Sequence, residues 1–221
     1  MIRALVFDFD GLILDTEVPI YQAWAEIYEE YGQRLELELW QRVIGRGPGY
    51  FDPVAALERR LGRSLDREAI QARRRRRELE LVERLTVQPG VREWCAQAVS
   101  MGARVGVASS SSRAWVTRHL RRLGLDNWDC IRCRDDVARA KPAPDVYLSV
   151  LECLGLRPEE ALAVEDSEAG VTAAKAAGMH CVAVPSTLTA GHDLGGADLV
   201  LRSLAERSFA EVAAAVAKGS S

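Results

Sequence analysis

The prediction of the fold starts from residues 4–17, which read ALVFDFDGLILDTE. The apolar beginning suits a buried strand, but the run then reaches Asp8 and Asp10, one residue apart, and Gly11 follows at once. Because side chains alternate along an extended chain, both carboxylates would lie on one side of it and repel each other. A hard divalent cation between them would remove the repulsion, and such oxygen ligands suit Mg²⁺. The alternative is a pair of aspartates in an exposed turn before glycine.

The composition indicates an ordinary globular protein. The chain has 221 residues, 48% of them hydrophobic, which is enough for one domain with an insertion or for two small domains. Its net charge of −3 gives no general attraction to nucleic acid or to anionic membranes, so we expect neither as a partner. No apolar run reaches the roughly 18 to 20 residues that span a bilayer, and we expect a soluble, cytoplasmic protein.

The cysteines are odd in number and lie in apolar surroundings, at Cys95, Cys130, Cys133, Cys153 and Cys181. This pattern favours reduced thiols in the core over a disulfide framework. Residues 130–133 form a Cys-X-X-Cys motif, but no second pair of ligands lies nearby. A zinc or redox site there is therefore the less favoured interpretation.

After Glu17 the apolar periodicity changes from that of a strand to that of a helix. It predicts helical pieces at about residues 20–31, 36–44, 51–61 and 66–85, which together would form a small helical insertion with its own apolar faces. Residues 45–49, GRGPG, are too rich in glycine and proline for a helix and predict a loop. Such loops often face a ligand, so Arg46 is a candidate contact for an anionic substrate; the alternative is a solvent-exposed arginine.

The same insertion carries a basic run at residues 73–77 that would cover all sides of a helix. We expect a solvated surface in which these arginines pair with Glu78, Glu80 and Glu83, and we disfavour a nucleic-acid site.

From Pro89 onward the sequence alternates between helical and extended patterns. Helices are expected at about 90–101, 112–123, 143–154, 169–177 and in an Ala-rich C-terminal stretch, and strands at 104–108, 128–132, 161–164, 181–184 and 198–201; residues 218–221 should fray. This order predicts an α/β protein whose parallel sheet is covered on both faces. Asp8, Ser109 and Asp166 each follow a predicted strand, so they should meet at the carboxyl edge of the sheet, where α/β proteins bind ligands.

Four short motifs, taken together, resemble those of the haloacid dehalogenase-like hydrolase superfamily. They are DFDG at 8–11, ASSSS at 108–112, KPAPD at 141–145 and VEDS at 164–167, in the order and at the spacings typical of the family. The resemblance covers nearly the whole chain and points to the branch of phosphatases and beta-phosphoglucomutase-like enzymes with a helical cap. It implies a Rossmann-like catalytic core at 1–15 and 86–221 and a helical cap domain at 16–85.

The resemblance also implies catalytic roles. Asp8 corresponds to the nucleophile that attacks phosphorus and forms an aspartyl phosphate, and Asp10 to the general acid and base. Family members that cleave carbon–halogen bonds generally lack the second aspartate, so Asp10 indicates phosphate esters. Ser109 corresponds to the hydroxyl that holds phosphoryl oxygens, and Lys141 to the cation that offsets charge on the nucleophile.

The same comparison implies a Mg²⁺ site. Its ligands would be the side chain of Asp8, the backbone carbonyl of Asp10 and the carboxylate of Asp166, with Glu165 either binding through water or supporting the site. Gly11, Ser110, Glu17 and Arg46 are candidate substrate contacts.

Several of these residues have structural alternatives. Ser109, or any of the three serines after it, could simply cap a helix, and Lys141 could be an exposed loop residue. Thr16 and Glu17 could form a hinge or a helix start. The three histidines, His119, His180 and His192, lie outside the motifs and are expected to be structural or at the surface.

The leading function is a magnesium-dependent phosphatase that hydrolyses a small phosphorylated metabolite, a sugar phosphate or nucleotide-related monoester, as a monomer or weak homodimer. The alternative is a beta-phosphoglucomutase-like phosphotransferase. Such mutases usually carry a histidine where Ile20 stands and a cap arginine near Pro48, where only Arg46 could substitute. A third reading is a binding protein without catalysis, which the complete set of charged groups disfavours.

Overall fold

The computed structural model describes residues 1–44 and 51–218. Arg46 and the predicted loop at 45–49 lie outside these residues. The described residues form a sheet of six parallel strands in the order β3-β2-β1-β4-β5-β6. The strands are β1 (Ala4–Phe7), β2 (Arg104–Ala108), β3 (Cys130–Arg132), β4 (Ala161–Glu165), β5 (His180–Ala183) and β6 (Leu199–Val200). The predicted parallel α/β fold is confirmed, with the opening stretch of the sequence at its centre.

Both faces of the sheet are covered because apolar residues occupy successive positions along the central strands. Leu5 and Phe7 face one cluster and Ala4 and Val6 face the other, as strand alternation requires. The first cluster packs on α5 (Val91–Ser100), α6 (Arg113–Arg122) and α9 (Phe209–Lys218). The second packs on α7 (Asp145–Leu154) and α8 (Glu168–Ala176). Each element lies within a few residues of its predicted position.

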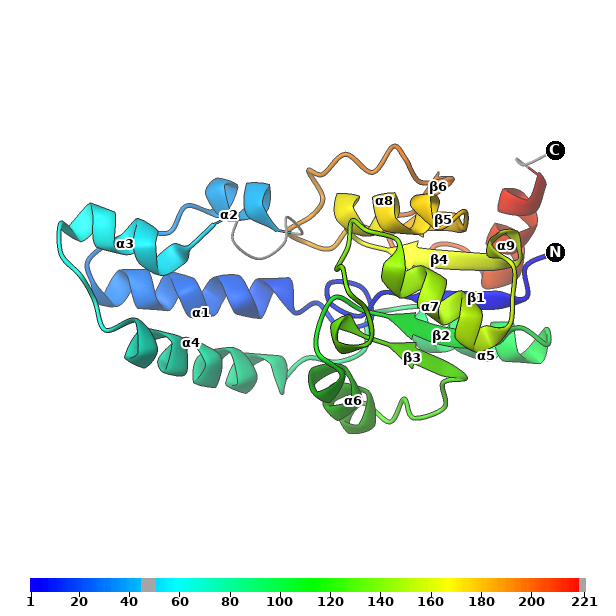
Figure 1. The fold of residues 1–221 in the computed structure, drawn as a ribbon, viewed down its shortest axis with the longest axis horizontal. Helices are drawn as coiled ribbons and strands as arrows, with labels where there is room; N and C mark the ends of the chain where they lie inside the picture. The colour runs from blue at the N-terminus through cyan, green and yellow to red at the C-terminus, as the bar shows by residue number, and fades with distance from the viewer. Residues whose placement is uncertain (45–50, 219–221) are drawn as a thin grey trace.

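Four further described helices follow β1 in the chain and project beyond one end of the sheet (Figure 1). They are α1 (Glu17–Glu30), α2 (Leu37–Val43), α3 (Pro53–Leu61) and α4 (Arg67–Val82), and we call residues 17–82 the helical segment. Its own apolar cluster is built around Trp24, Tyr28 and Leu57. Leu188, which follows β5, is buried in the same cluster, so a loop of the sheet-bearing part contacts the helical segment.

The basic run lies on α4, and its ion pairs differ in part from those expected. Arg77 pairs with Glu80 and Arg74 with Glu78, as predicted, but Glu83 pairs with Arg118 of α6. The Arg74–Glu78 pair is also mostly buried, with 17% and 12% of the side chains exposed. One side of α4 packs against α1, so the run cannot be solvated on every face.

The prediction that all cysteines are reduced is wrong for two of them. Cys130 of β3 and Cys153 of α7 form a disulfide, with their Cα atoms 6.4 Å apart. The contact arises because α7 packs on β3, which the spacing of cysteines in the sequence does not reveal. Cys95, Cys133 and Cys181 are free.

None of the helices in the described residues combines the length and the apolar character needed to cross a bilayer.

Candidate active site

The sheet brings the first and fourth motifs together. Phe7 is in register with Val164, and the backbone N–H of Asp8 donates to the carbonyl of Val164 at 2.9 Å. Glu165 is the last residue of β4, and Asp166 follows it. Residues directly after two adjacent parallel strands must lie side by side, so Asp8 and Asp166 meet at the carboxyl edge.

A tight turn after Asp10 depends on Gly11. Its φ is +88°, a region that favours glycine, and its N–H donates to the carbonyl of Leu14 at 2.8 Å. A Cβ added to Gly11 would lie 2.1 Å from Oδ2 of Asp166. Gly11 is therefore needed both for the turn and to leave space for that carboxylate.

Lys141 joins three strands at the base of the site. Its ammonium group donates to Oδ1 of Asp8, to Oε1 of Glu165 and, at 2.9 Å, to the carbonyl of Ala108. Only 5% of its side chain is exposed. Burial alone would lower the pKa of Lys141, but the neighbouring carboxylates of Asp8 and Glu165 raise it above its usual value. The lysine is thus not an exposed loop residue and carries a positive charge against Asp8.

Opposing effects act on the pKa of Asp8. Burial raises its pKa to about 7, helped by the nearby Glu165 and Asp10 carboxylates and opposed by Lys141. Further positive charge at the site would keep Asp8 ionised at neutral pH.

Glu165 is fixed beneath the site by groups on α7 and α8. Its Oε1 also accepts a hydrogen bond from the hydroxyl of Tyr147, and the Tyr147 ring lies 4.9 Å from the Lys141 ammonium. A Cβ on Gly170 would lie 1.8 Å from Oε2 of Glu165, so only glycine fits at that position of α8. Among the described residues, Oε2 is buried with no hydrogen-bond partner.

Three carboxylates form a candidate metal centre. Asp8, Glu165 and Asp166 each offer one oxygen, and these oxygens all lie within 4.8 Å of one another. Burial, and then the charges of Asp8 and Glu165, raise the pKa of Asp166. Thr189 Oγ1 donates to Oδ2 of Asp166 at 3.4 Å. Three buried carboxylates crowded in this way, with oxygens as the donor atoms, fit a hard divalent cation such as Mg²⁺.

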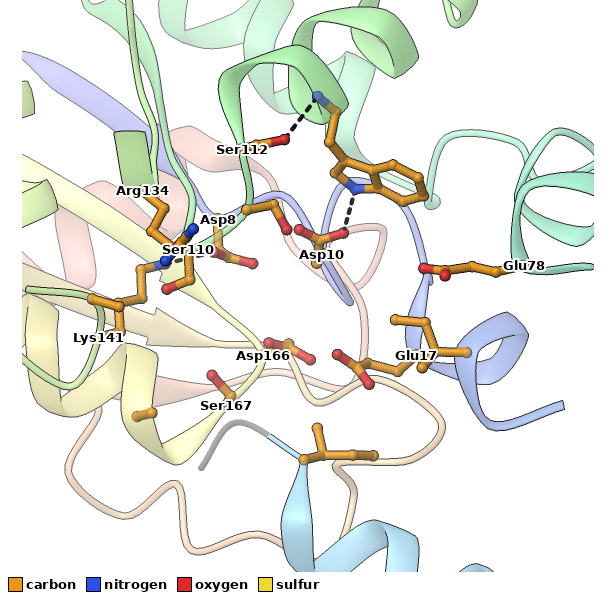
Figure 2. Close-up of a pocket in the computed structure, with 16 residues that line it drawn as sticks. Asp8, Asp10, Glu17, Glu78, Ser110, Ser112, Arg134, Lys141, Asp166 and Ser167 are labelled. Carbon is orange, nitrogen blue, oxygen red and sulfur yellow. Dashed lines mark hydrogen bonds and ion pairs between the residues drawn. The ribbon is translucent and has the colours of Figure 1, made fainter. Parts of the chain in front are cut away.

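Asp10 is held apart from that cluster on the other side of the site. Its Oδ1 accepts two hydrogen bonds. One comes from Thr16 Oγ1 at 2.9 Å, and the other comes from the indole N–H of Trp115 at 3.0 Å (Figure 2). Thr16, which the sequence left open as a hinge or helix start, therefore also orients this carboxylate.

The serines at 109–112 have different surroundings and different hydrogen bonds. Ser109 is fully buried, and its Oγ accepts the N–H of Ser111 at 2.9 Å. Ser112 caps α6 by accepting the N–H of Trp115 at 3.3 Å, so the capping role belongs to Ser112 rather than to Ser109. Ser110 is the serine next to Ser109 that lines the open side of the site.

A cavity of about 410 Å³ opens in front of these groups. Asp8, Asp10, Asp166 and Lys141 line it from the sheet edge. Further lining groups from the same part of the chain and from the helical segment are Ser110, Ser111, Ser112, Trp115, Arg134, Ser167, Glu17, Ile20, Ile44 and Glu78. Figure 2 shows the acidic and basic groups around one open space.

Glu17, a predicted substrate contact, is the first residue of α1 and lines the cavity. Burial, and then the carboxylates of Asp10, Asp15 and Asp8, raise its pKa to about 8. Glu17 is thus placed to contact a substrate. Arg46 cannot be placed, because it lies outside the described residues.

The histidines lie away from the cavity. His119 is buried beside Trp115, with the ring centroids 4.3 Å apart, and His192 contacts the carbonyl of Gln41 at 2.8 Å. His180 begins β5.

Sequence reasoning missed Trp115, Tyr147, Thr189, Arg134 and Glu78. Trp115 and Arg134 closely follow the serine motif and the third strand, so proximity to a predicted strand end was an available signal. Tyr147 lies two residues after the KPAPD motif, but packing decides that its side of α7 faces Glu165. Thr189 and Glu78 are remote from the motifs, and only the packing brings them to the site.

Comparisons with known proteins agree with this geometry. The family model described as haloacid dehalogenase-like hydrolase matches residues 5–184. "Putative phosphatase YhcW" of Bacillus subtilis is 44% identical over 95% of this chain and 96% of its own length. The "Phosphorylated carbohydrates phosphatase" of Thermotoga maritima is 32% identical over 80% of this chain and 82% of its own.

A solved structure gives the same result for the fold. The crystal structure of a "putative beta-phosphoglucomutase" from Thermotoga maritima superposes with a TM-score of 0.79 at 30% identity, over 96% of this chain and 99% of that one.

Proposed function

The chain belongs to the haloacid dehalogenase-like hydrolases and is a phosphoric monoester hydrolase, and from that premise we propose a more specific activity. The proposed activity is magnesium-dependent hydrolysis of a small phosphorylated metabolite, a sugar phosphate or a nucleotide-related monoester. The main support is one observation: Asp8 contacts Lys141 and belongs to the acidic cluster with Glu165 and Asp166, while Asp10 lines the same cavity but is held separately by Trp115.

Asp8 acts as the nucleophile. A carboxylate oxygen of Asp8 forms a bond to phosphorus as the bond from phosphorus to the leaving oxygen breaks, which gives an aspartyl phosphate. Water then breaks the new acyl phosphate and restores the carboxylate. Lys141 stays bonded to Asp8 and offsets negative charge, while Ser109 and Ser110 hold the phosphoryl oxygens beside the start of α6.

Asp10 moves the protons. Because Thr16 and Trp115 both donate to its Oδ1, the proton that Asp10 transfers is carried by Oδ2. Asp10 first gives this proton to the departing alkoxide and then takes one from the attacking water.

Mg²⁺ would be held by the carboxylates of Asp8 and Asp166 and the backbone carbonyl of Asp10, with Glu165 beside them. When bound, the cation shields the negative charge of the phosphoryl group from the attacking carboxylate.

We also propose the division of labour along the chain. Residues 1–15 and 86–221 serve as the catalytic core and residues 16–85 as a cap, with Gly11, Glu17 and Arg46 contributing contacts to the substrate. The apolar cluster of the helical segment supports this division. The monomeric or weakly dimeric state and the cytoplasmic location stay predictions.

The test is release of inorganic phosphate from p-nitrophenyl phosphate and from a panel of phosphorylated metabolites, with and without Mg²⁺. Asp8→Asn keeps the shape of the side chain but is a poor nucleophile, so it should lower phosphate release by at least about a thousandfold. Circular dichroism should show an unchanged fold. Near wild-type activity in this variant would mean that the nucleophile is assigned wrongly, and no turnover in the wild type would favour a binding protein.

The mutase alternative rests on the likeness to the Thermotoga maritima structure. It is opposed by Ile20, which lines the cavity where a histidine is expected. Incubation with beta-glucose 1-phosphate separates the two: a phosphatase releases phosphate, whereas rapid formation of glucose 6-phosphate without phosphate release would establish the mutase.

A further inference from the structure

Two carboxylates face the cavity from the helical segment. Glu17 is the first residue of α1, and Glu78 lies near the C-terminal end of α4. Figure 2 shows both carboxylate groups turned toward the space in front of Asp10 and Asp166. These two carboxylates are not needed as ligands of the proposed Mg²⁺ site, and they take no part in the acid–base chemistry of Asp8 and Asp10. A different role must therefore explain their position at the cavity.

Glu78 is fixed in place rather than solvated. Its Oε2 accepts a hydrogen bond from Arg74, whose guanidinium lies 5.7 Å from the centre of the Trp24 ring. Only 12% of the Glu78 side chain is exposed, compared with 51% for Glu80, which pairs with Arg77 two residues further along the same helix. A carboxylate braced in this way presents its other oxygen to the cavity at little cost in conformational entropy.

The opposite end of the cavity is basic. Arg134 and Lys141 line it from the sheet-bearing part, and Figure 2 shows them together with Ser110, across the open space from Glu17 and Glu78. The phosphoryl group belongs at this basic end, next to Asp8. The leaving group must then extend toward the two glutamates.

In the described part of the chain, Ile20 and Ile44 complete the end that the helical segment lines, and the cation that contacts this end, Arg74, is already paired with Glu78. Carboxylates accept hydrogen bonds and donate none when ionised, so hydroxyl and ammonium groups suit this end. A second phosphate or a carboxylate would instead be desolvated beside the charge of Glu78, whose partner Arg74 is already engaged. Glu17, with a pKa raised to about 8, adds a carboxyl group that is mostly protonated at neutral pH and that both donates and accepts hydrogen bonds.

We propose that Glu78, together with Glu17, determines specificity by selecting phosphate monoesters whose leaving group carries hydroxyl or ammonium donors and by rejecting leaving groups with a second anion. The inference rests on the proposed phosphatase function and names the class of its substrate.

The experiment compares three esters of similar six-carbon skeleton: glucosamine 6-phosphate, glucose 6-phosphate and 6-phosphogluconate, whose leaving groups are cationic, neutral and anionic. Values of kcat/KM are measured with Mg²⁺ for the wild type, Glu78→Gln, Glu78→Lys and the control Glu80→Lys. The wild type should prefer the amino sugar to the carboxylate by about tenfold or more, since hydrogen bonds between charged groups exceed neutral ones. Glu78→Gln should reduce this ratio. Glu78→Lys should reduce it by about a hundredfold relative to the wild type, so that the carboxylate ester becomes the preferred one.

Glu80→Lys makes the same change in net charge on the same helix but outside the cavity, so its ratio should stay that of the wild type. A wild type that hydrolyses p-nitrophenyl phosphate but does not discriminate among the three esters, or hydrolyses none of them, overturns the inference and leaves the phosphatase function standing. The inference is also overturned if Glu78→Lys and Glu80→Lys change the ratio of the kcat/KM values to the same extent. Failure to hydrolyse p-nitrophenyl phosphate counts against the phosphatase function itself. If Glu78→Lys does not fold, the ratio in Glu78→Gln decides.

Discussion

At the scale of single residues, we assign different roles to the two aspartates of the opening motif because their surroundings differ. Asp8 contacts a buried lysine and two other carboxylates, whereas Asp10 contacts a hydroxyl and an indole. In the first environment, the charge of Lys141 opposes the rise in the pKa of Asp8 that burial causes, so part of this carboxylate stays ionised near neutral pH. The second environment suits a carboxyl group that exchanges protons. Because only Phe9 separates Asp8 from Asp10, the end of a single strand supplies both carboxylates.

The pair of donors on Asp10 leads to a test of its orientation. Trp115→Phe and Thr16→Val each remove one donor to Oδ1, and each should lower kcat by about three- to tenfold with a smaller change in KM, because one hydrogen bond is worth roughly 1 kcal/mol. The double variant should lose more or less than the product of the single effects, since both donors act on one atom. Strictly multiplicative losses in steady-state kinetics would show that the two donors do not share the task of orienting Asp10.

The sequence predicted the residues that we propose bind phosphorus or metal, but it did not predict the residues that hold them in place. The motif residues stand at strand ends, where the order of apolar runs already predicts that they meet. Trp115 and Tyr147 lie close to motifs in the chain, but packing sets the rotation of their helices about their own axes, so the sequence does not show that they contact Asp10 and Glu165. The disulfide between Cys130 and Cys153 escaped prediction for the same reason.

At the scale of elements, the turn after β1 depends on backbone geometry as much as on chemistry. Gly11→Ala forces a side chain into a positive φ and against Asp166, whereas Gly32→Ala, at a φ of +67°, meets no atom within 4 Å. The control variant, Gly32→Ala, should lower the free energy of unfolding only by the backbone strain, about 1 to 2 kcal/mol. Gly11→Ala should lower the free energy of unfolding, measured in urea, by more than the control does. It should also raise the Mg²⁺ concentration for half-maximal activity, because Asp166 must move. Equal effects of the two substitutions would contradict this account.

Helix α6 carries a histidine that should make stability depend on pH. Burial, and then the charges of Arg122 and Arg118, lower the pKa of His119 to about 4 against the opposing pull of Asp10 and Glu83. The unfolded chain, with a pKa near 6.5, then binds the proton more readily than the folded one. The contribution of His119 is therefore complete above about pH 6.5 and is lost as the pH falls toward about 4.

Urea unfolding of the wild type and of His119→Gln at several pH values isolates this effect from that of the carboxylates. Between about pH 7 and pH 4.5, the free energy of unfolding of the wild type should fall by on the order of 2 kcal/mol more than that of the variant. Parallel stability curves for the two proteins would show that His119 is not the titrating group.

At the scale of the whole molecule, the helical segment and the sheet were each predictable, but the link between them was not. Alternating strands and helices indicate the sheet, and a long helical stretch inserted after β1 indicates the segment. The loop after β5 carries no motif, yet it reaches both parts. Leu188 is buried in the apolar cluster of the helical segment, and the next residue, Thr189, donates to Asp166 at the candidate metal centre.

This link predicts that the helical segment and the metal centre are coupled. Leu188→Ala leaves a void in the cluster and should cost about 2 kcal/mol or more locally. Amide hydrogen exchange in residues 17–44 and 51–82 should accelerate more than in the strands, and the Mg²⁺ concentration for half-maximal activity should rise because Thr189 is displaced from Asp166. Leu201→Ala is the matched control, since Leu201 is equally apolar and buried but packs in the cluster beneath the sheet. It should accelerate exchange in the strands and α5 instead. If Leu188→Ala changes exchange only in residues 185–190, with no change in the Mg²⁺ requirement, the loop merely covers the cluster and does not couple the two parts.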